Sequence, residues 1–332
     1  WALAPKGMGK ISKSRGGGPV APMTWLEQYS ADALRYWSSS TGLGKDAYIS
    51  EEKVQAGAKL VNKLWNVARF GSRFLGDDTP AKPSSFSLAD RWLLAKTAVL
   101  INRTTQLFRS YDYATAKSEI EAYFYRELAD NYLEMAKLRL YEKGEQTAGA
   151  TYALYHALLA TCKLFAPILP HVTERIYMAL FAAHEGQASI HTAAWPTTPA
   201  WWLDDAGEAA LTQGEKLVEI ATAVRRFKSE RSLSPGAPLA TLHISGAAAK
   251  GLTAGSTDLK SITRAAKVSF TAVSPTPTKE QIPVGEIMIK IRPYPQTPPR
   301  RGGARRAPPS RPQPIYNQIR TLSARQPFPL SL

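Results

Sequence analysis

The stretch that decides the fold runs from Ser50 to Gly76 and reads SEEKVQAGAKLVNKLWNVARFGSRFLG. Ser50 is a typical N-cap residue, and the two glutamates that follow it suit the positive end of a helix dipole. Apolar residues then recur at spacings of three and four, the period of an α-helix with one buried face. We expect the inward side chains to be Val54, Ala58, Val61, Trp65, Ala68 and Leu75. The pattern predicts a long amphipathic helix that other helices must cover.

Three further helical segments follow, at about 89–110, 114–141 and 148–165. In the second of these, an apolar stripe is formed by Ile120, Phe124, Leu128, Tyr132 and Met135. Pro167 and Pro170 end the last segment, because proline lacks the N–H that a helix interior requires. Four long helices with short links predict a mainly α fold built on an antiparallel helical bundle.

The composition changes after the bundle. A connector with the sequence AAWPTTPAWWLDD leads to an amphipathic helix whose expected basic face holds Arg225, Arg226, Lys228 and Arg231. The runs LATLHIS, KVSFTAV and GEIMIKI then predict strands of a small α+β module. From Arg292 onward the chain is rich in Pro and Arg, so we expect a disordered tail or one unrelated to the fold. The predicted divisions are 1–45, 46–192 (bundle), 193–291 (connector and module) and 292–332 (tail).

Charge and cysteine content limit the class of protein. The formal net charge is +15, which favours a polyanionic partner such as nucleic acid. The single cysteine, Cys162, excludes an intramolecular disulfide and suggests a reducing cytoplasm, and its apolar helical setting predicts a buried, inert thiol. No apolar run approaches the length of a membrane span, so we expect a cytoplasmic protein that does not bind membranes.

Residues 6–19 read KGMGKISKSRGGGP. Glycines permit close backbone approach and lysines supply mobile positive charge, so the composition suits a phosphate-binding loop. The same composition also suits a solvated basic tail. The residues alone leave both interpretations open.

The segment KISKS, from Lys10 to Ser14, resembles the second nucleotide-loop motif of class I aminoacyl-tRNA synthetases, which usually reads Lys-Met-Ser-Lys-Ser. Downstream, YSADALRYW, KLVNKLWNVARF, FYRELADNYLEMAKLRLY and LFAPILPHVTERIY each resemble a block of the valyl members, in the same order, across about residues 6–286. Isoleucyl members share this architecture and are the alternative within the family. The pair Trp65 and Asn66 favours the valyl members.

The resemblance implies an enzyme that activates valine with ATP and transfers it to tRNA. It assigns Lys13 as the principal ligand of the ATP phosphates and Lys10 as its helper, with Ser12 and Ser14 in the same loop. Positive charge there would stabilise the charge that accumulates on phosphate oxygens in the transition state. Mg²⁺ would accompany ATP, and we expect no tightly bound cofactor and no protein metal site.

Two features depart from the family. Ile11 and Gly17 stand where the family usually has Met and Asn, and none of the five histidines forms the His-x-Gly-His motif that the catalytic domain requires. We therefore expect this chain to be a C-terminal part of such an enzyme, which binds tRNA but has no ligase activity alone. We also expect it to be a monomer. The alternative is a stand-alone helical RNA-binding module without ligase activity.

By the same resemblance, the bundle is an anticodon-binding domain. Single-stranded bases are recognised by stacking on aromatic rings and by hydrogen bonds to their edges. The tRNA-binding candidates are Asn62, Lys63, Asn66, Arg69 and Phe70. For Phe70, a stacking role and a core role both remain open.

Four other polar residues are candidates for chemistry. Asp130, Asn131 and Glu134 resemble a catalytic acid cluster, yet hydrogen bonding within the bundle is the favoured interpretation. His171 directly follows Pro170, and we expect it to be a structural residue at a helix N-terminus rather than a base.

Overall fold

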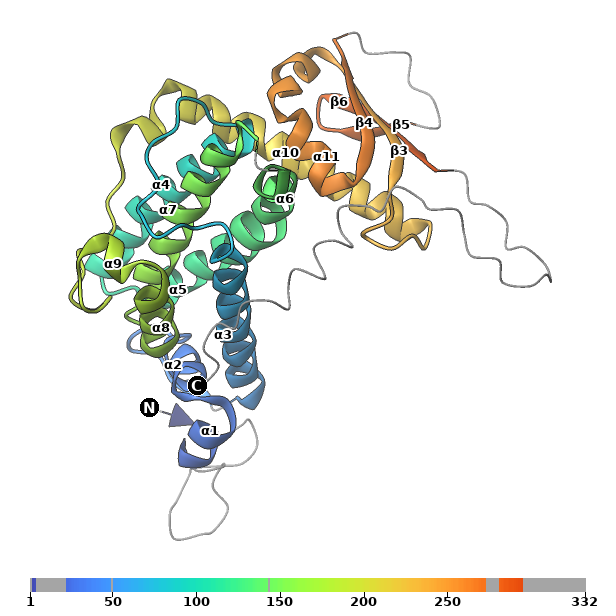
Figure 1. Cartoon of the computed structure of the whole chain (residues 1–332). Coiled ribbons are helices and arrows are strands. Elements are labelled where there is room, and N and C mark those ends of the chain that lie inside the picture. The colour runs from blue at the N-terminus through green and yellow to red at the C-terminus, as the bar shows by residue number, and fades with distance from the viewer. Residues whose placement is uncertain (1, 4–21, 49, 143, 273–280, 295–332) are drawn as a thin grey trace, which may run out of the picture. The chain divides into compact units, whose positions relative to one another are not determined.

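The structure is a computed structural model that describes residues 2–3, 22–48, 50–142, 144–272 and 281–294 (Figure 1). The N-terminal helices are α1 (Pro22–Tyr29), α2 (Ala31–Ser38) and α3 (Glu51–Gly71). The remaining helices of the bundle are α4 (Leu88–Arg109), α5 (Tyr113–Ala122), the π-helix η2 (Tyr123–Tyr132), α6 (Leu133–Glu142), α7 (Thr147–Phe165), α8 (Pro170–Leu180) and α9 (Ala182–Glu185). Two short strands, β1 (Ala2–Leu3) and β2 (Ala47–Tyr48), pair in parallel.

A second group of elements follows the bundle in the chain. It comprises the 3-10 helix η3 (Ala200–Leu203), α10 (Asp205–Glu230), β3 (Leu239–Ser245), η4 (Ala247–Gly255), α11 (Ser256–Thr263), β4 (Ala265–Thr271), β5 (Gln281–Val284) and β6 (Ile287–Pro293). The mainly helical fold with a small α+β module is therefore confirmed. No helix among the described residues is both long enough and apolar enough to cross a bilayer.

Side-chain caps fix where the helices begin. The Oγ atoms of Ser30 and Ser50 accept from the backbone N–H groups three residues on, at the starts of α2 and α3. Ser87 and Asp90 form a reciprocal capping box at the start of α4. The predicted cap at Ser50 is thus confirmed, and Ser30 acts in the same way, because both side chains satisfy N–H groups that have no partner within the helix.

The buried face of α3 agrees with the prediction at Val54 and Ala68 and differs from it by about one residue between them. Leu60 and Leu64 are fully buried, whereas Val61 and Trp65 are only partly buried at the edge of the core. Leu60 and Leu64 are each followed directly by another apolar residue, Val61 and Trp65. The spacing of apolar residues therefore does not determine how the helix is rotated about its axis. Helix α3 also ends at Gly71, five residues before the predicted end at Gly76.

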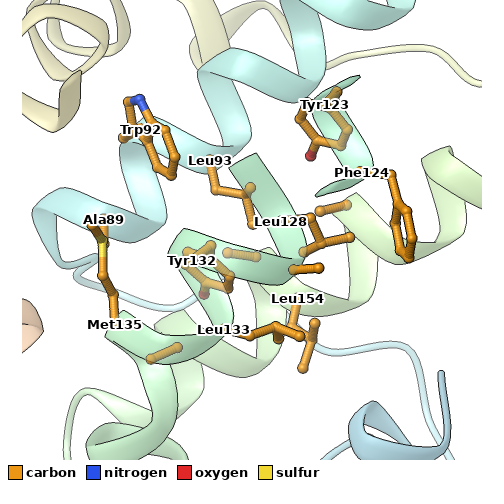
Figure 2. Packing of buried hydrophobic residues seen from close by; sticks show 14 of the residues in the cluster. Ala89, Trp92, Leu93, Tyr123, Phe124, Leu128, Tyr132, Leu133, Met135 and Leu154 are labelled. Atoms are coloured by element: carbon orange, nitrogen blue, oxygen red, sulfur yellow. The ribbon is translucent and has the colours of Figure 1, made fainter. Parts of the chain in front are cut away.

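The predicted helix over 114–141 is observed as α5, η2 and α6 in continuous succession. Its middle has π-helical geometry, and there the Asn131 side-chain amide donates to the carbonyl of Arg126. All five residues of the predicted apolar stripe are fully buried. Figure 2 shows Phe124, Leu128 and Tyr132 of η2 in the core with Leu93 of α4 and Leu154 of α7.

The connector packs on the bundle through its tryptophans. The Trp195 ring lies 5.3 Å from the Phe108 ring, and the Trp201 ring lies 5.3 Å from the Phe86 ring, both measured between centroids. Trp202 is almost fully buried. These contacts attach the chain that leads into α10 to the surface of α4 and α7.

The described strands of the C-terminal module form a four-stranded sheet in the order β4-β3-β6-β5. β3 and β4 are parallel, and the other two pairs are antiparallel. β6 includes Arg292 and Pro293, which pair with Thr241 and Leu239. These two residues therefore belong to the sheet, although the sequence places them in the tail. The predicted tail beyond Tyr294 lies outside the described residues.

A buried ion cluster, which consists of Asp90, Arg139 and Asp258, joins the bundle to this module. The Arg139 Nη1 atom lies 2.8 Å from Asp90 Oδ2, and its Nη2 atom lies 2.9 Å from Asp258 Oδ1. The Tyr132 hydroxyl also donates a hydrogen bond to Asp90. Burial raises the pKa of Asp258 to about 6, against the opposing effect of Arg139. One guanidinium thus connects α4, α6 and α11 within a continuous core.

The expected basic face of α10 needs correction. The Lys228 ammonium is buried and donates to the carbonyl oxygens of Pro235 and Thr263. Burial and the nearby Arg264 lower the pKa of Lys228 to about 8. Arg231 lies over the Phe227 ring. Lys228 therefore attaches the end of α10 to the module instead of facing solvent.

Gly214 lets α10 approach α4 closely. A Cβ atom at this position would overlap the Trp92 side chain, which is fully buried. Glycine in a helix interior costs about 1 kcal/mol relative to alanine. Its presence in the middle of α10 is explained by the lack of space beside Trp92.

We predict that Arg139→Met lowers the free energy of unfolding by about 3–5 kcal/mol, because two carboxylates then remain buried without a counter-charge. Lys137→Met on the same helix is the control, since its ion pair with Glu134 is near the surface and should contribute about 0–1 kcal/mol. Urea denaturation of both variants measures the difference. Equal stability of the two variants would contradict the role of the buried ion cluster.

We also predict that Gly214→Ala destabilises the protein by about 1–3 kcal/mol through overpacking against Trp92, although alanine is the better helix former. Thr212→Ala, at an exposed position of α10, is the control and should change stability by less than about 0.5 kcal/mol. Thermal unfolding compares the two. A Gly214→Ala protein as stable as the parent would show that α4 and α10 do not pack as described.

Candidate nucleic-acid interface

All five tRNA-binding candidates lie on one side of α3. Asn62, Asn66 and Arg69 are exposed, whereas Lys63 and Phe70 are partly buried at the edges of this surface. Successive steps of four, three and one residue lead from Asn62 to Phe70, so these side chains share one side of the helix. The buried Leu60 and Leu64 lie on the opposite side. We call these five residues the α3 surface.

The polar groups of the α3 surface are held by weak, accessible bonds. The Arg69 guanidinium donates to Asn66 Oδ1 at 3.3 Å. The Lys63 ammonium lies 3.3 Å from Asp130 Oδ1, with side-chain exposures of 40% and 52%. Exposed ion pairs of this kind contribute little to stability. Both cations can therefore exchange these partners for phosphate oxygens at small cost.

An aromatic cluster, formed by Phe70, Phe74 and Tyr141, lies at the C-terminal end of the α3 surface. The Phe70 and Phe74 ring centroids are 5.1 Å apart, and the Phe74 and Tyr141 centroids are 5.0 Å apart. All three residues are partly buried, and the Tyr141 hydroxyl is itself buried. Arg69 is exposed in the last turn of α3, and Arg73 is exposed in the turn that follows the helix. The arrangement combines rings that can stack on bases with cations that can bind phosphates.

The structure shows two members of this cluster that the sequence analysis missed. Phe74 is four residues after Phe70, a spacing that would bring the two rings together in the predicted helix to Gly76, although in the structure Phe74 lies in the turn after α3. Tyr141 comes from α6, far away in the sequence, and no local pattern indicates it. For Phe70, the two alternatives are not exclusive, because its ring packs at the edge of the core and remains partly exposed.

Asp130, Asn131 and Glu134 are engaged in hydrogen bonds and ion pairs. Asn131 Oδ1 accepts from Arg225 Nη2 at 2.6 Å, and Glu134 Oε2 lies 3.0 Å from Arg264 Nη2. These contacts attach η2 and α6 to α10 and to the turn before β4. Asn131 and Glu134 therefore have structural contacts, but these reach beyond the bundle to which the prediction confined them, and the Asp130 side chain forms the exposed ion pair with Lys63.

Helix α2 is fixed to the junction between α7 and α8 by two charged side chains. The buried carboxylate of Asp32 accepts from the backbone N–H groups of His171 and Val172, at 3.2 and 2.7 Å. Arg35 donates to the carbonyl oxygens of Pro167 and Ile168. The negative Asp32 thus lies at the positive N-terminal end of α8, and the positive Arg35 lies at carbonyl oxygens that follow the negative C-terminal end of α7. The expected position of His171 at a helix N-terminus is confirmed, since α8 begins at Pro170.

Other candidates for chemistry are absent or undescribed. Lys10, Ser12, Lys13 and Ser14 lie outside the described residues, so their assignment to ATP stays a prediction. Cys162 is fully buried, and burial raises the pKa of its thiol, which makes it unreactive. In the described part of the chain, no three His, Cys, Asp or Glu residues are grouped so as to hold a metal ion.

Residues 90–244 match the family described as the anticodon-binding domain of tRNA ligase. This range contains Tyr141 and the bundle from α4 onward, whereas α3 precedes it. A solved complex of the Agrobacterium radiobacter K84 LeuRS with tRNA and LeuAMS superposes with a TM-score of 0.45 at 17% identity, covering 59% of this chain and 23% of that chain. That similarity is too low to support an inference.

Curated relatives extend the similarity beyond this domain. The chain is 35% identical over 74% of its length to the valine–tRNA ligase of Orientia tsutsugamushi, of which it covers 30%. It is 36% identical over 81% of its length to that of Rickettsia conorii, covering 34%. It is 39% identical over 83% of its length to that of Methanopyrus kandleri, covering 30%. The chain therefore spans about a third of the length of these relatives. The chain is thus similar to valine–tRNA ligases over most of its length, and its residues 90–244 match the anticodon-binding domain of tRNA ligase.

Proposed function

We propose that this chain binds valine tRNA and reads its anticodon loop with the α3 surface and the aromatic cluster. The observation that carries the proposal is the grouping of Phe70, Phe74 and Tyr141 beside two exposed arginines, on a bundle that matches an anticodon-binding domain. Unpaired loop bases bind proteins by stacking on aromatic rings. Partly exposed rings offer such a surface while their buried edges keep them in position.

Each residue type of the α3 surface has a distinct part in this proposal. Phe70 supplies a ring for stacking, and the amides of Asn62 and Asn66 can both donate to and accept from base edges. Arg69 and Lys63 neutralise phosphates after leaving Asn66 and Asp130. The rings and amides would distinguish one anticodon from another, whereas the cations would bind all tRNAs.

We further propose that the chain serves an ATP-dependent valine–tRNA ligase. In the intact enzyme, Lys13 would be the principal ligand of the ATP phosphates and Lys10 its helper, with Ser12 and Ser14 in the same loop and Mg²⁺ accompanying ATP. Support comes from the KISKS sequence and from three relatives that are valine–tRNA ligases. A cytoplasmic monomer fits this function.

The competing proposal is a stand-alone RNA-binding module without ligase activity, for which the anticodon-binding match and the net charge of +15 would suffice. Both proposals expect that this polypeptide alone shows no valine-dependent pyrophosphate exchange. They differ in the role of the KISKS loop: it binds ATP in the ligase and RNA in the stand-alone module.

In a ligase that contains this segment, we predict that Lys13→Ala lowers the rate of valine activation by about 10²- to 10³-fold, the usual effect of removing one group that stabilises transition-state charge. Affinity for tRNA should stay unchanged. Arg15→Ala, which removes a neighbouring charge outside the motif, is the control and should be nearly as active as the parent. Equal losses of activation and tRNA affinity would favour the RNA-binding module.

We predict that Phe70→Ala abolishes the preference for a valine anticodon over an unrelated one, because it removes a stacking surface that contributes about 1–3 kcal/mol. Phe70→Tyr keeps the ring and should keep the preference. Phe108→Ala, which removes another partly buried ring on a different helix, is the control for lost packing. Fluorescence anisotropy with two tRNA transcripts measures the preference, and thermal unfolding measures stability.

The two roles of Phe70 give different results in this experiment. If the ring only fills the core, Phe70→Ala lowers the melting temperature strongly, by the equivalent of about 3–5 kcal/mol, and the folded fraction keeps its anticodon preference. A well-folded Phe70→Ala protein with an unchanged preference would remove Phe70 from the recognition site.

A further inference from the structure

The two faces of the C-terminal sheet differ in chemistry. On one face, Leu242, Ile244 and Ile289 are fully buried. Their cross-strand partners Phe270 and Ile282 pack against the same core. Elements α10, α11 and η4 contact the strands, as Figure 1 also shows for α11 beside β4. This face is the attachment of the module to the bundle.

The other face, which we call the open face, is polar and basic. Because side chains alternate along a strand, the neighbours of the buried residues point to it. The strand register places its residues in three rows: Lys267, Thr241 and Arg292; then Ser269, His243, Lys290 and Gln281; then Thr271, Ser245, Met288 and Pro283 near the β5–β6 turn. His243 Nδ1 lies 2.9 Å from Ser269 Oγ, which confirms that neighbouring strands share this face. Lys267 and Arg292 are both exposed.

The charge of the open face has one sign. Within the four described strands there is no Asp or Glu, whereas Lys267, Lys290 and Arg292 are all on this face. Glu286 lies in the turn between β5 and β6. The three rows also lack Phe, Tyr and Trp, so His243 is their one aromatic ring, and it is hydrogen-bonded to Ser269.

We propose that the open face binds the phosphodiester backbone of the tRNA, as a contact separate from the α3 surface. The proposal rests on the proposed function, because it assumes that tRNA is the polyanion bound. Lys267 and Arg292 lie on either side of β3, about 10 Å apart for two strand spacings. Lys290 and Arg292 are two residues apart, about 7 Å along β6. These separations suit several phosphates of one nucleic-acid strand.

The same residues explain why the contact is with the backbone and not with bases. Cations and the hydroxyls of Thr241 and Ser269 are common partners of phosphate and sugar oxygens, and such contacts position RNA without reading its sequence. An anionic membrane is the other polyanion to consider. Peripheral membrane binding usually adds apolar side chains that enter the lipid, and the two rows that hold the three cations offer none, since Met288 and Pro283 lie in the third row.

The test uses the full chain and two double variants with equal loss of charge. Lys267→Gln/Arg292→Gln changes the open face. Lys250→Gln/Lys260→Gln changes η4 and α11, which lie on the covered side of the same sheet. The probes are labelled transcripts of valine tRNA, one with its own anticodon and one with an altered anticodon. Anisotropy is measured between 50 and 200 mM salt, and thermal unfolding verifies that both variants fold.

The open-face variant should bind both tRNAs about 10-fold more weakly at low salt, with a slope of log K against log salt that is smaller by about 1.5, as expected for two lost phosphate contacts. Its anticodon preference should be unchanged, and the control variant should bind like the parent. Equal binding by the two variants, or a loss of anticodon preference in the open-face variant, would overturn the proposal. The proposal would also be overturned if the open-face variant lost binding to phosphatidylserine vesicles but kept its affinity for tRNA, because the face would then bind membranes.

Failure of the proposed function would look different. If the parent chain does not distinguish the two anticodons, the α3 surface does not read them. The comparison of the two double variants still decides whether the open face binds RNA phosphates.

Discussion

The Arg139 guanidinium is the contact on which the rest of the architecture depends. It lies between Asp90 at the start of α4 and Asp258 in α11, with all three charges buried. Burying ions costs free energy, and a well-packed apolar core of the same volume would often be at least as stable. The ion cluster does restrict geometry, because only one placement of three helices satisfies it. It therefore sets where the sheet lies relative to the bundle.

That placement connects the two surfaces proposed to contact tRNA. Tyr141, a member of the aromatic cluster, follows Arg139 by two residues on α6, and the open face belongs to the sheet that α11 supports. A shift of Arg139 would move both. At the other end of the bundle, Asp32 and Arg35 fix α2 against the α7–α8 junction. Since α2 follows the KISKS segment in the chain, this contact would link the proposed ATP-binding loop to the anticodon-binding domain.

Local signals in the sequence were sufficient for much of the fold. Serine caps, the stripe from Ile120 to Met135 and the run LATLHIS, which coincides with β3, all depend on neighbouring residues only. The rotation of α3 was wrong by about one residue, because two adjacent apolar rows compete in that segment. Lys228 was assigned to a solvent-facing surface, because nothing nearby in the sequence shows the carbonyls of Pro235 and Thr263 that bind it. Tyr141 and the ion cluster likewise depend on residues far apart in the chain.

The central claim is that the anticodon loop lies on the α3 surface and the aromatic cluster. Chemical footprinting of a valine tRNA transcript, bound to saturating amounts of the full chain, tests it most directly. The account predicts protection of the anticodon-loop bases and a second footprint limited to sugars and phosphates elsewhere on the tRNA. An anticodon loop that stays as reactive as in free tRNA, while other regions become protected, would contradict it.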